Sequence, residues 1–141
     1  MANVKTLTRL LFGALFVAAG LNHFRNPGFY VGIMPPYLPW HLELVYLSGV
    51  AEIALGVMLL VPRWTVTAAW GLIALLIAVF PANLHMTMHA ELYPSISLTA
   101  LWLRLPIQGV LIAWAYWYTR EASPHRIGLA DVVTRGRRGG T

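Results

Sequence analysis

Two apolar stretches joined by a two-residue link decide the fold: LELVYLSGVAEIALGVMLLV (residues 42–61), then Pro62-Arg63, then WTVTAAWGLIALLIAVF (residues 64–80). A membrane-spanning helix needs about 20 mostly apolar residues. Neither stretch alternates apolar and polar residues, as a half-buried strand of a soluble fold does. The link allows only a tight turn, so the sequence predicts an antiparallel pair of membrane-spanning helices.

Two further apolar stretches, near residues 5–21 and 98–118, are long enough to form a first and a fourth span. The third stretch can be extended past Pro81 toward His89. Hydrophobic residues make up 58% of the 141 residues and charged residues only 11%, whereas soluble domains carry about 25% charged residues. We therefore predict an all-α membrane four-helix bundle over residues 1–120, surrounded by the lipid bilayer. The composition argues against a soluble enzyme, a disordered chain and a nucleic-acid-binding module.

The segment from residue 23 to residue 40 differs from the spans. It contains four prolines and two glycines, and a continuous helix cannot accommodate them. We expect an ordered, proline-rich interfacial loop between the first and second spans. Aromatic side chains favour the membrane–water interface, and the expected anchors are Phe29, Tyr30, Tyr37 and Trp40.

The distribution of positive charge predicts the topology. Of the ten Lys and Arg residues, only Arg25 and Arg104 lie away from the termini and the tight turn. Because cytoplasmic loops carry the excess of Lys and Arg, both termini are expected on the cytoplasmic side of the cytoplasmic (inner) membrane. Residues 121–141 form a basic tail, expected to be disordered. A cleaved signal peptide is the alternative for the first span, with Val17-Ala18-Ala19 as a weak cleavage pattern.

Polar side chains concentrate in the outer halves of the predicted spans, whereas the cytoplasmic halves carry almost none. Polar groups inside a span are costly and normally face the bundle interior. The sequence therefore predicts a polar pocket that opens toward the outer face, and the candidate ligand-binding residues are His23, Glu52, Asn83, His85, Arg104 and Gln108.

Glu52 and Arg104 are the charged residues expected to meet inside the bundle. At 1.5 Å per residue, Glu52 lies about 15 Å and Arg104 about 9 Å below the start of its span. The extended side chain of Arg104 is long enough to span this difference in depth and reach Glu52. The pair either serves the pocket or only fixes the register of the two helices.

His85 and His89 share one helix face if the third span continues past Pro81. They form a weak candidate for a metal site, which needs a third ligand such as His23 or Glu91. No HExxH-type signature accompanies them, so we predict no metal. Interfacial histidines that bond to headgroups, water or loop carbonyls are the simpler interpretation.

A quinone or a similar lipid-soluble ligand with a polar head is a further possibility for the pocket. His23, His85, Asn83 and Arg104 can supply hydrogen bonds, and Glu52 can relay a proton. We expect the apolar wall from Trp102, Phe24 and Phe80, although ordinary packing accounts for each aromatic residue taken alone.

Several of these motifs, taken in order, resemble the DoxX-like family of small bacterial integral membrane proteins over residues 5–119. The runs that carry the resemblance are GLNHF with NP (residues 20–24 and 26–27), PPYLP (35–39), SGVAEIALG (48–56), FPANLHM (80–86) and LWLRLPIQ (101–108). The family's motif positions found here are His23, Pro27, Glu52, Asn83, His85 and Arg104.

The resemblance implies a four-helix membrane bundle with a redox connection. The family's name links it to the small subunits of an archaeal thiosulfate:quinone oxidoreductase. Some mycobacterial relatives are described as membrane partners of a superoxide dismutase and a sulfurtransferase. Because this chain has no Cys, any thiol or persulfide chemistry belongs to a partner or a substrate.

Three functions are consistent with the sequence. The first is a redox-linked membrane subunit, as in a quinone-linked oxidoreductase, whose pocket binds a quinone-like ligand. The second is a non-catalytic membrane anchor that recruits soluble redox or oxidative-stress proteins. The third, a small-solute permease, requires a homo-oligomer because four spans leave little room for a path within one chain.

Overall fold

The computed structural model describes residues 2–120; the basic tail expected at residues 121–141 lies outside them. The described chain is all-helical. Its elements are α1 (Ala2–Arg25), α2 (Pro27–Gly32), α3 (His41–Leu60), the 3₁₀ turn η1 (Pro62–Trp64), α4 (Thr65–Met88), η2 (Ala90–Leu92) and α5 (Leu98–Thr119). The helices α1, α3, α4 and α5 are long and apolar enough to cross a membrane. The protein is therefore a membrane four-helix bundle, as the sequence predicts.

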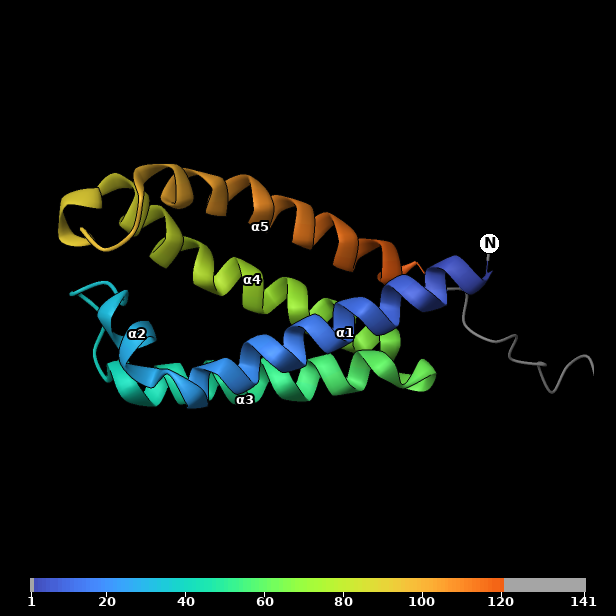
Figure 1. Ribbon diagram of the computed structural model, residues 1–141. Helices are drawn as coiled ribbons and strands as arrows, with labels where there is room; N and C mark the ends of the chain where they lie inside the picture. The colour runs from blue at the N-terminus through green and yellow to red at the C-terminus, as the bar shows by residue number, and fades with distance from the viewer. Residues whose placement is uncertain (1, 121–141) are drawn as a thin grey trace, which may run out of the picture.

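The helices form two antiparallel pairs, α1 with α3 and α4 with α5, and α3 also packs against α4 (Figure 1). The beginning of α1, the turn η1 and the end of α5 lie together at one end of the bundle, called here the terminal end. The opposite end, with α2, residues 33–40 and η2, is called the loop end. The two pairs lie close together at the terminal end and diverge toward the loop end.

Glycines allow α1 and α3 to approach closely at two points. A Cβ atom on Gly13 would lie 2.9 Å from the carbonyl oxygen of Gly56, and one on Gly20 would lie 2.7 Å from that of Gly49. The contacts are reciprocal and lie seven residues apart on each helix. Small residues at such positions let helix backbones pack tightly in lipid, where hydrophobic association between helices is absent.

The larger buried core cluster lies in the terminal half of the bundle, and a smaller one of Met86, Tyr93 and Leu101 lies at the loop end. Ten side chains from all four long helices form the larger cluster: Phe12, Phe16, Leu59, Ala68, Ala69, Leu72, Ile73, Leu76, Ala115 and Tyr118. Phe12 lies against the rings of Phe16, Trp114 and Tyr118, with centroid distances of 4.5–5.9 Å. Outside this core, each long helix exposes large apolar side chains, as lipid-facing helices do.

Arg9 is a charged residue inside the first span. Its side chain is 7% exposed, and its Nη1 donates a hydrogen bond of 2.7 Å to Oγ1 of Thr65. This bond ties α1 to the first residue of α4. Lys5, one turn earlier, lies over the ring of Trp117 on α5.

The segment between the first and second spans is more helical than expected. α1 continues to Arg25, and α2 starts at Pro27, because a proline in the first turn of a helix loses no hydrogen bond. The extended loop is limited to residues 33–40. Similarly, α4 continues through Pro81 to Met88. This confirms the prediction that the third span can extend past Pro81 toward His89.

Candidate functional site

A pocket of about 630 Å³ lies at the loop end, where the two helix pairs diverge. All four long helices, α2 and residues 33–38 contribute to it, and most of its walls are apolar. A volume of this size is typical of small-molecule sites, which lie in the range of about 300–1,000 Å³. The lining residues are His23, Tyr30, Ile33, Met34, Leu38, Leu44, Val45, Leu47, Ser48, Ala51, Glu52, Leu75, Ala78, Val79, Ala82, Asn83, Met86 and Arg104.

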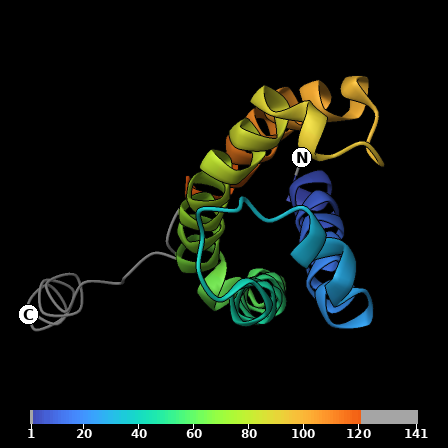
Figure 2. The ribbon, with the colours of Figure 1, turned by 90° about the vertical axis from the view of Figure 1, so that its left-hand side faces the viewer.

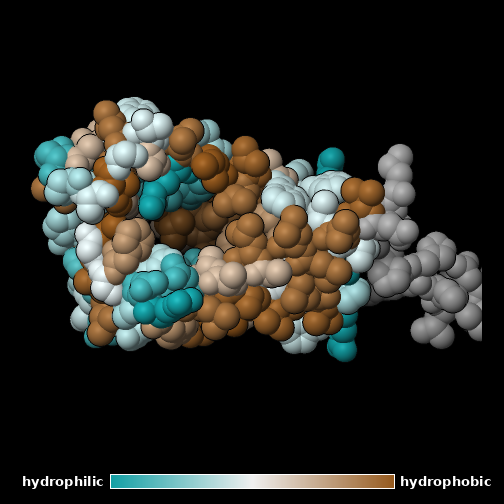
Figure 3. All heavy atoms as spheres, viewed as in Figure 1, coloured by the Kyte–Doolittle hydropathy of each residue, from teal (hydrophilic) through white to brown (hydrophobic). Residues whose placement is uncertain are grey.

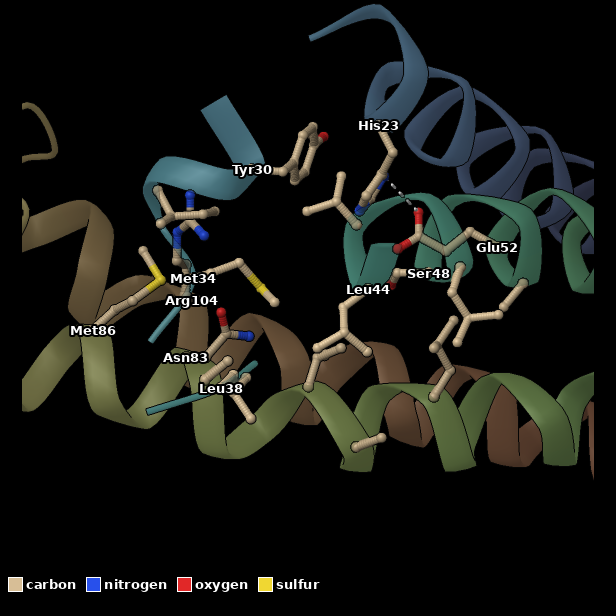
Figure 4. A pocket seen from close by; sticks show the side chains of 18 residues that line it. His23, Tyr30, Met34, Leu38, Leu44, Ser48, Glu52, Asn83, Met86 and Arg104 are labelled. Atoms are coloured by element: carbon tan, nitrogen blue, oxygen red, sulfur yellow. Dashed lines mark ion pairs between the residues drawn. The ribbon is translucent and has the colours of Figure 1, made fainter. Parts of the chain in front are cut away.

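His23 is held firmly at one side of the pocket (Figure 4). Its Nδ1 lies 2.9 Å from the carbonyl oxygen of Ala19, one helical turn back, and its ring stacks on Tyr30 at a centroid distance of 3.9 Å. A carbonyl oxygen only accepts hydrogen bonds, so Nδ1 carries the proton. Nε2 is therefore the ring nitrogen left to bond to a ligand.

Glu52 lies beside His23, with Oε2 3.7 Å from the histidine Nδ1. Oε2 is buried and accepts no hydrogen bond from the residues that the structure describes. The expected pairing of Glu52 with Arg104 is wrong, because the ionisable neighbour of Glu52 is His23. The reason is geometric: α3 packs along α1 and α4, whereas Arg104 belongs to α5, which packs along α4.

Arg104 lines the pocket on the side away from Glu52, near Met34 and Asn83 (Figure 4). Within residues 2–120 its guanidinium group makes no hydrogen bond and no ion pair, and it is only partly exposed. A cation inside a span normally has a partner, because an unpaired charge in lipid is costly. The pocket thus has, on opposite sides of an apolar cavity, a buried carboxylate oxygen and a cation with no partner among the described residues.

Asn83 and Gln108 connect the pocket wall to α5. Nδ2 of Asn83 donates a 2.9 Å hydrogen bond to Oε1 of Gln108, and Nε2 of Gln108 donates to the carbonyl oxygen of Leu76. Gln108 is buried but does not line the pocket. Gln108 was expected to contact a ligand. Instead, it bonds to Asn83 on the side away from the pocket and connects α4 to α5.

His85 lies outside the pocket, contrary to expectation. Its Nδ1 is 3.4 Å from the hydroxyl of Tyr93, and its ring packs edge-on against Tyr37. Burial raises the pKa of Tyr93, and Tyr37 nearby adds to this effect, so the phenol keeps its proton. These residues form a separate cluster beyond the pocket, at the end of α4.

His89 does not complete a metal site with His85. The two rings are 4.6 Å apart, and His89 Nδ1 lies 3.3 Å from Oε1 of the exposed Glu91. Backbone hydrogen bonding lowers the pKa of Glu91, with a smaller effect from His89. Between residues 2 and 120, no group of three His, Asp or Glu side chains is arranged to hold a metal ion. His23, suggested as a third ligand, lines the pocket instead.

The prediction that aromatic residues form the apolar wall of the pocket is wrong. Phe24, Phe80 and Trp102 are exposed on the outer surface of the bundle rather than in the pocket. Aliphatic residues of α3 and α4 form the wall instead, together with Met34 and Leu38. Among the four expected interfacial anchors, Phe29, Tyr37 and Trp40 are exposed, whereas Tyr30 turns inward onto His23.

Residues 33–40 close the loop end of the bundle. Figure 2 shows this segment passing across the space between the helices at that end. Pro35 is fully buried, and its carbonyl oxygen lies 3.1 Å from Nε2 of His41. Trp40 holds a left-handed backbone conformation (φ 51°) at the start of α3. A non-glycine residue adopts this conformation at an energetic cost, so surrounding contacts fix the segment in place.

Comparison with known proteins gives one family. A family described as a domain of unknown function (DUF8561) matches residues 12–119, which include the four long helices except for the first turns of α1. No curated protein and no solved structure matches the chain.

Proposed function

We propose that this chain, which belongs to the family described as a domain of unknown function (DUF8561), binds a quinone-like, lipid-soluble ligand in the pocket at its loop end. In this proposal it is a redox-linked subunit of a membrane oxidoreductase. The chain supplies the binding site and the groups that bond to the ligand head, and a partner protein supplies the electrons. The resemblance to DoxX-like proteins supports the redox connection.

One observation carries the proposal: an apolar cavity among membrane-spanning helices has hydrogen-bonding groups at two separate points. Quinone carbonyl oxygens accept hydrogen bonds, and the guanidinium of Arg104 is a donor with no other partner in the described chain. At the other point, Nε2 of His23 accepts from a quinol hydroxyl when the ring is neutral. Oε2 of Glu52 lies 3.7 Å from Nδ1, so it can exchange the Nδ1 proton and balance a proton that is gained or lost at Nε2.

Removing either charged group should weaken ligand binding. In detergent-solubilised protein, we expect Arg104→Ala to reduce the affinity for a decyl-substituted benzoquinone at least about tenfold, because a hydrogen bond to a charged group contributes about 1.5–3 kcal/mol. Glu52→Gln, which keeps the shape but removes the charge, should weaken binding of the corresponding quinol, because the quinol hydroxyl is the group that donates to His23 beside Glu52. Titration calorimetry measures both effects.

Arg25→Ala is the matched control, because Arg25 lies at the same end of the bundle but is exposed and does not line the pocket. Its affinity should equal that of the unaltered protein. If Arg104→Ala, Glu52→Gln and Arg25→Ala all bind the quinone and the quinol equally well, the ligand does not occupy this pocket. Mass spectrometry after extraction in mild detergent then shows which lipids, quinones or proteins accompany the chain.

The alternative function, a non-catalytic anchor for soluble redox or oxidative-stress proteins, has one observation in its favour. Three aromatic side chains at the loop end are at least half exposed: Phe29 (50%), Tyr37 (59%) and Trp40 (73%). Such residues favour the membrane interface and also protein contacts. Crosslinking followed by purification distinguishes the two functions, because an anchor retains one consistent soluble partner and loses it when Tyr37 and Trp40 are replaced by Ser.

Single cysteines can test the proposed topology, because the natural chain has none. We propose that the terminal end lies in the cytoplasm, since Lys and Arg concentrate there. A charged, membrane-impermeant maleimide added to spheroplasts should then label Ser95→Cys at the loop end and leave Pro62→Cys in η1 unlabelled. Lysed cells, in which both sites are accessible, provide the control. Labelling of only Pro62→Cys in intact spheroplasts would reverse the orientation.

A further inference from the structure

The helices α1 and α5 do not pack along one another, and the ring contacts between them lie near the terminal end. Phe12 packs on Trp114 and Tyr118, and Lys5 lies over Trp117. Between the later half of α1 and the earlier half of α5, no hydrogen bond, ion pair or ring contact is present within residues 2–120. The ring of helices is therefore closed at one end and open between α1 and α5 at the other.

This opening lies in the side of the bundle rather than at its end. Figure 3 shows a hollow with an apolar floor on the face between α5 and α1, with hydrophilic residues above and below it and hydrophobic residues toward the terminal end. Residues 33–40 pass across the end of the bundle (Figure 2), and Met34 and Leu38 of this segment line the pocket. Tyr37 and the buried Pro35 fix this cover against His85 and His41.

We propose that the pocket is loaded sideways from the bilayer, through the window between the later half of α1 and the earlier half of α5. The ligand is an amphiphile whose polar head lies between His23 and Arg104 and whose apolar tail passes through the window into the acyl chains. This inference rests on the proposed function for the chemistry of the head and adds the tail and the route.

The depth of the polar groups agrees with such a ligand. His23 lies two residues before the end of α1, and Arg104 is six residues into α5, which corresponds to about 9 Å of helix at 1.5 Å per residue. A head held there lies just below the membrane surface. A tail directed sideways meets the hydrocarbon of the same leaflet, and a water-soluble molecule without a tail has no comparable path.

Cysteine labelling in nanodiscs can test the route. Ser48→Cys places a thiol of similar size on the pocket wall, and Ala51→Cys is a second pocket position in case the first variant does not fold. Ser95→Cys marks the water-exposed loop end, and Gly109→Cys marks the lipid-facing side of α5, where a Cβ meets nothing within 4 Å. Each variant is treated with a long-chain alkyl maleimide and, separately, with a sulfonated maleimide.

We expect the pocket cysteine to react with the alkyl maleimide at a rate similar to that of Gly109→Cys, the control for slow thiol ionisation in lipid. The sulfonated reagent should label the pocket at least about tenfold more slowly than Ser95→Cys, because its charge is excluded from hydrocarbon. Sulfonated labelling as fast as at Ser95→Cys would show a route from water and overturn the proposal. Resistance to both reagents would show a sealed cavity and overturn it as well.

Preloading with the decyl-substituted benzoquinone separates this proposal from the proposed function. Protection of the pocket cysteine, with Gly109→Cys still reactive, supports both. If only the alkyl maleimide labels the pocket cysteine and the quinone does not slow this labelling, the lateral route is supported and quinone binding is contradicted. Protection combined with fast sulfonated labelling keeps quinone binding and contradicts the lateral route.

Discussion

Gly20→Ala should lower the thermal unfolding temperature of the solubilised protein by several degrees. The new Cβ atom would lie 2.7 Å from the carbonyl oxygen of Gly49 and 2.9 Å from the backbone nitrogen of Ile53. Backbone atoms cannot move aside as a flexible side chain can, so α1 and α3 must separate. Forcing extra volume into a packed interior costs about 1–3 kcal/mol. Each kcal/mol corresponds to about 2–4 °C in a domain of this size.

Gly109→Ala is the matched control because it introduces the same methyl group into another spanning helix. Its Cβ meets nothing within 4 Å, and alanine favours a helix over glycine, so the unfolding temperature should stay the same or rise. Thermal unfolding in detergent, followed by circular dichroism or size-exclusion chromatography, measures both variants. Equal unfolding temperatures for the two would show that the close contact between α1 and α3 does not stabilise the bundle.

The same glycine contact also positions the candidate site. A Cβ on Gly49 would lie 2.8 Å from the Cβ of His23, so Gly49→Ala should displace the histidine from Glu52. The close packing of α1 on α3 thus brings the histidine and the carboxylate together. The stability of this helix pair and the geometry of the pocket are therefore two consequences of one packing arrangement.

The spans were predictable because lipid imposes a simple requirement on sequence, about 20 apolar residues per helix with every backbone group bonded internally. The same requirement explains why α4 continues through Pro81, where a helix in water would tend to break. Helix ends were less predictable. Whether residues 23–25 extend α1, and whether Pro27 starts a new helix, depends on the tertiary contacts of Tyr30 with His23 and Asn22.

The candidate site was only partly predictable. The depth of a side chain in the membrane can be read from its position along a helix. The direction in which it points around the helix axis is harder to judge from sequence. The pocket stripe on α4 runs through Leu75, Val79, Asn83 and Met86, at intervals of three or four residues. His85 falls on a neighbouring face, although its depth is suitable. The Glu52–Arg104 pairing failed because depth was considered without knowing which helices are adjacent.

The end of the bundle where α1 meets α5 should depend on one side chain. Phe12 is fully buried and packs on Phe16, Trp114 and Tyr118. Phe12→Ala should therefore leave a cavity at the contact that closes the ring of helices. In soluble cores this change costs about 3–5 kcal/mol. We expect a similar or somewhat smaller loss here, because the lost packing contacts are the same but lipid tails are as apolar as the core.

Phe80→Ala is the control for this change, since Phe80 is 42% exposed on the surface of α4 and lies outside the core cluster. Its unfolding temperature should stay within a few degrees of the unaltered protein, whereas Phe12→Ala should fall well below it. Spin labels placed on the exposed Leu7 and Ala113, after both are replaced by Cys, should also report a broader distance distribution in the Phe12→Ala background. An unchanged distribution and an unchanged unfolding temperature would mean that other contacts hold α1 against α5. Phe12 would then not be the contact that closes the ring of helices at the terminal end.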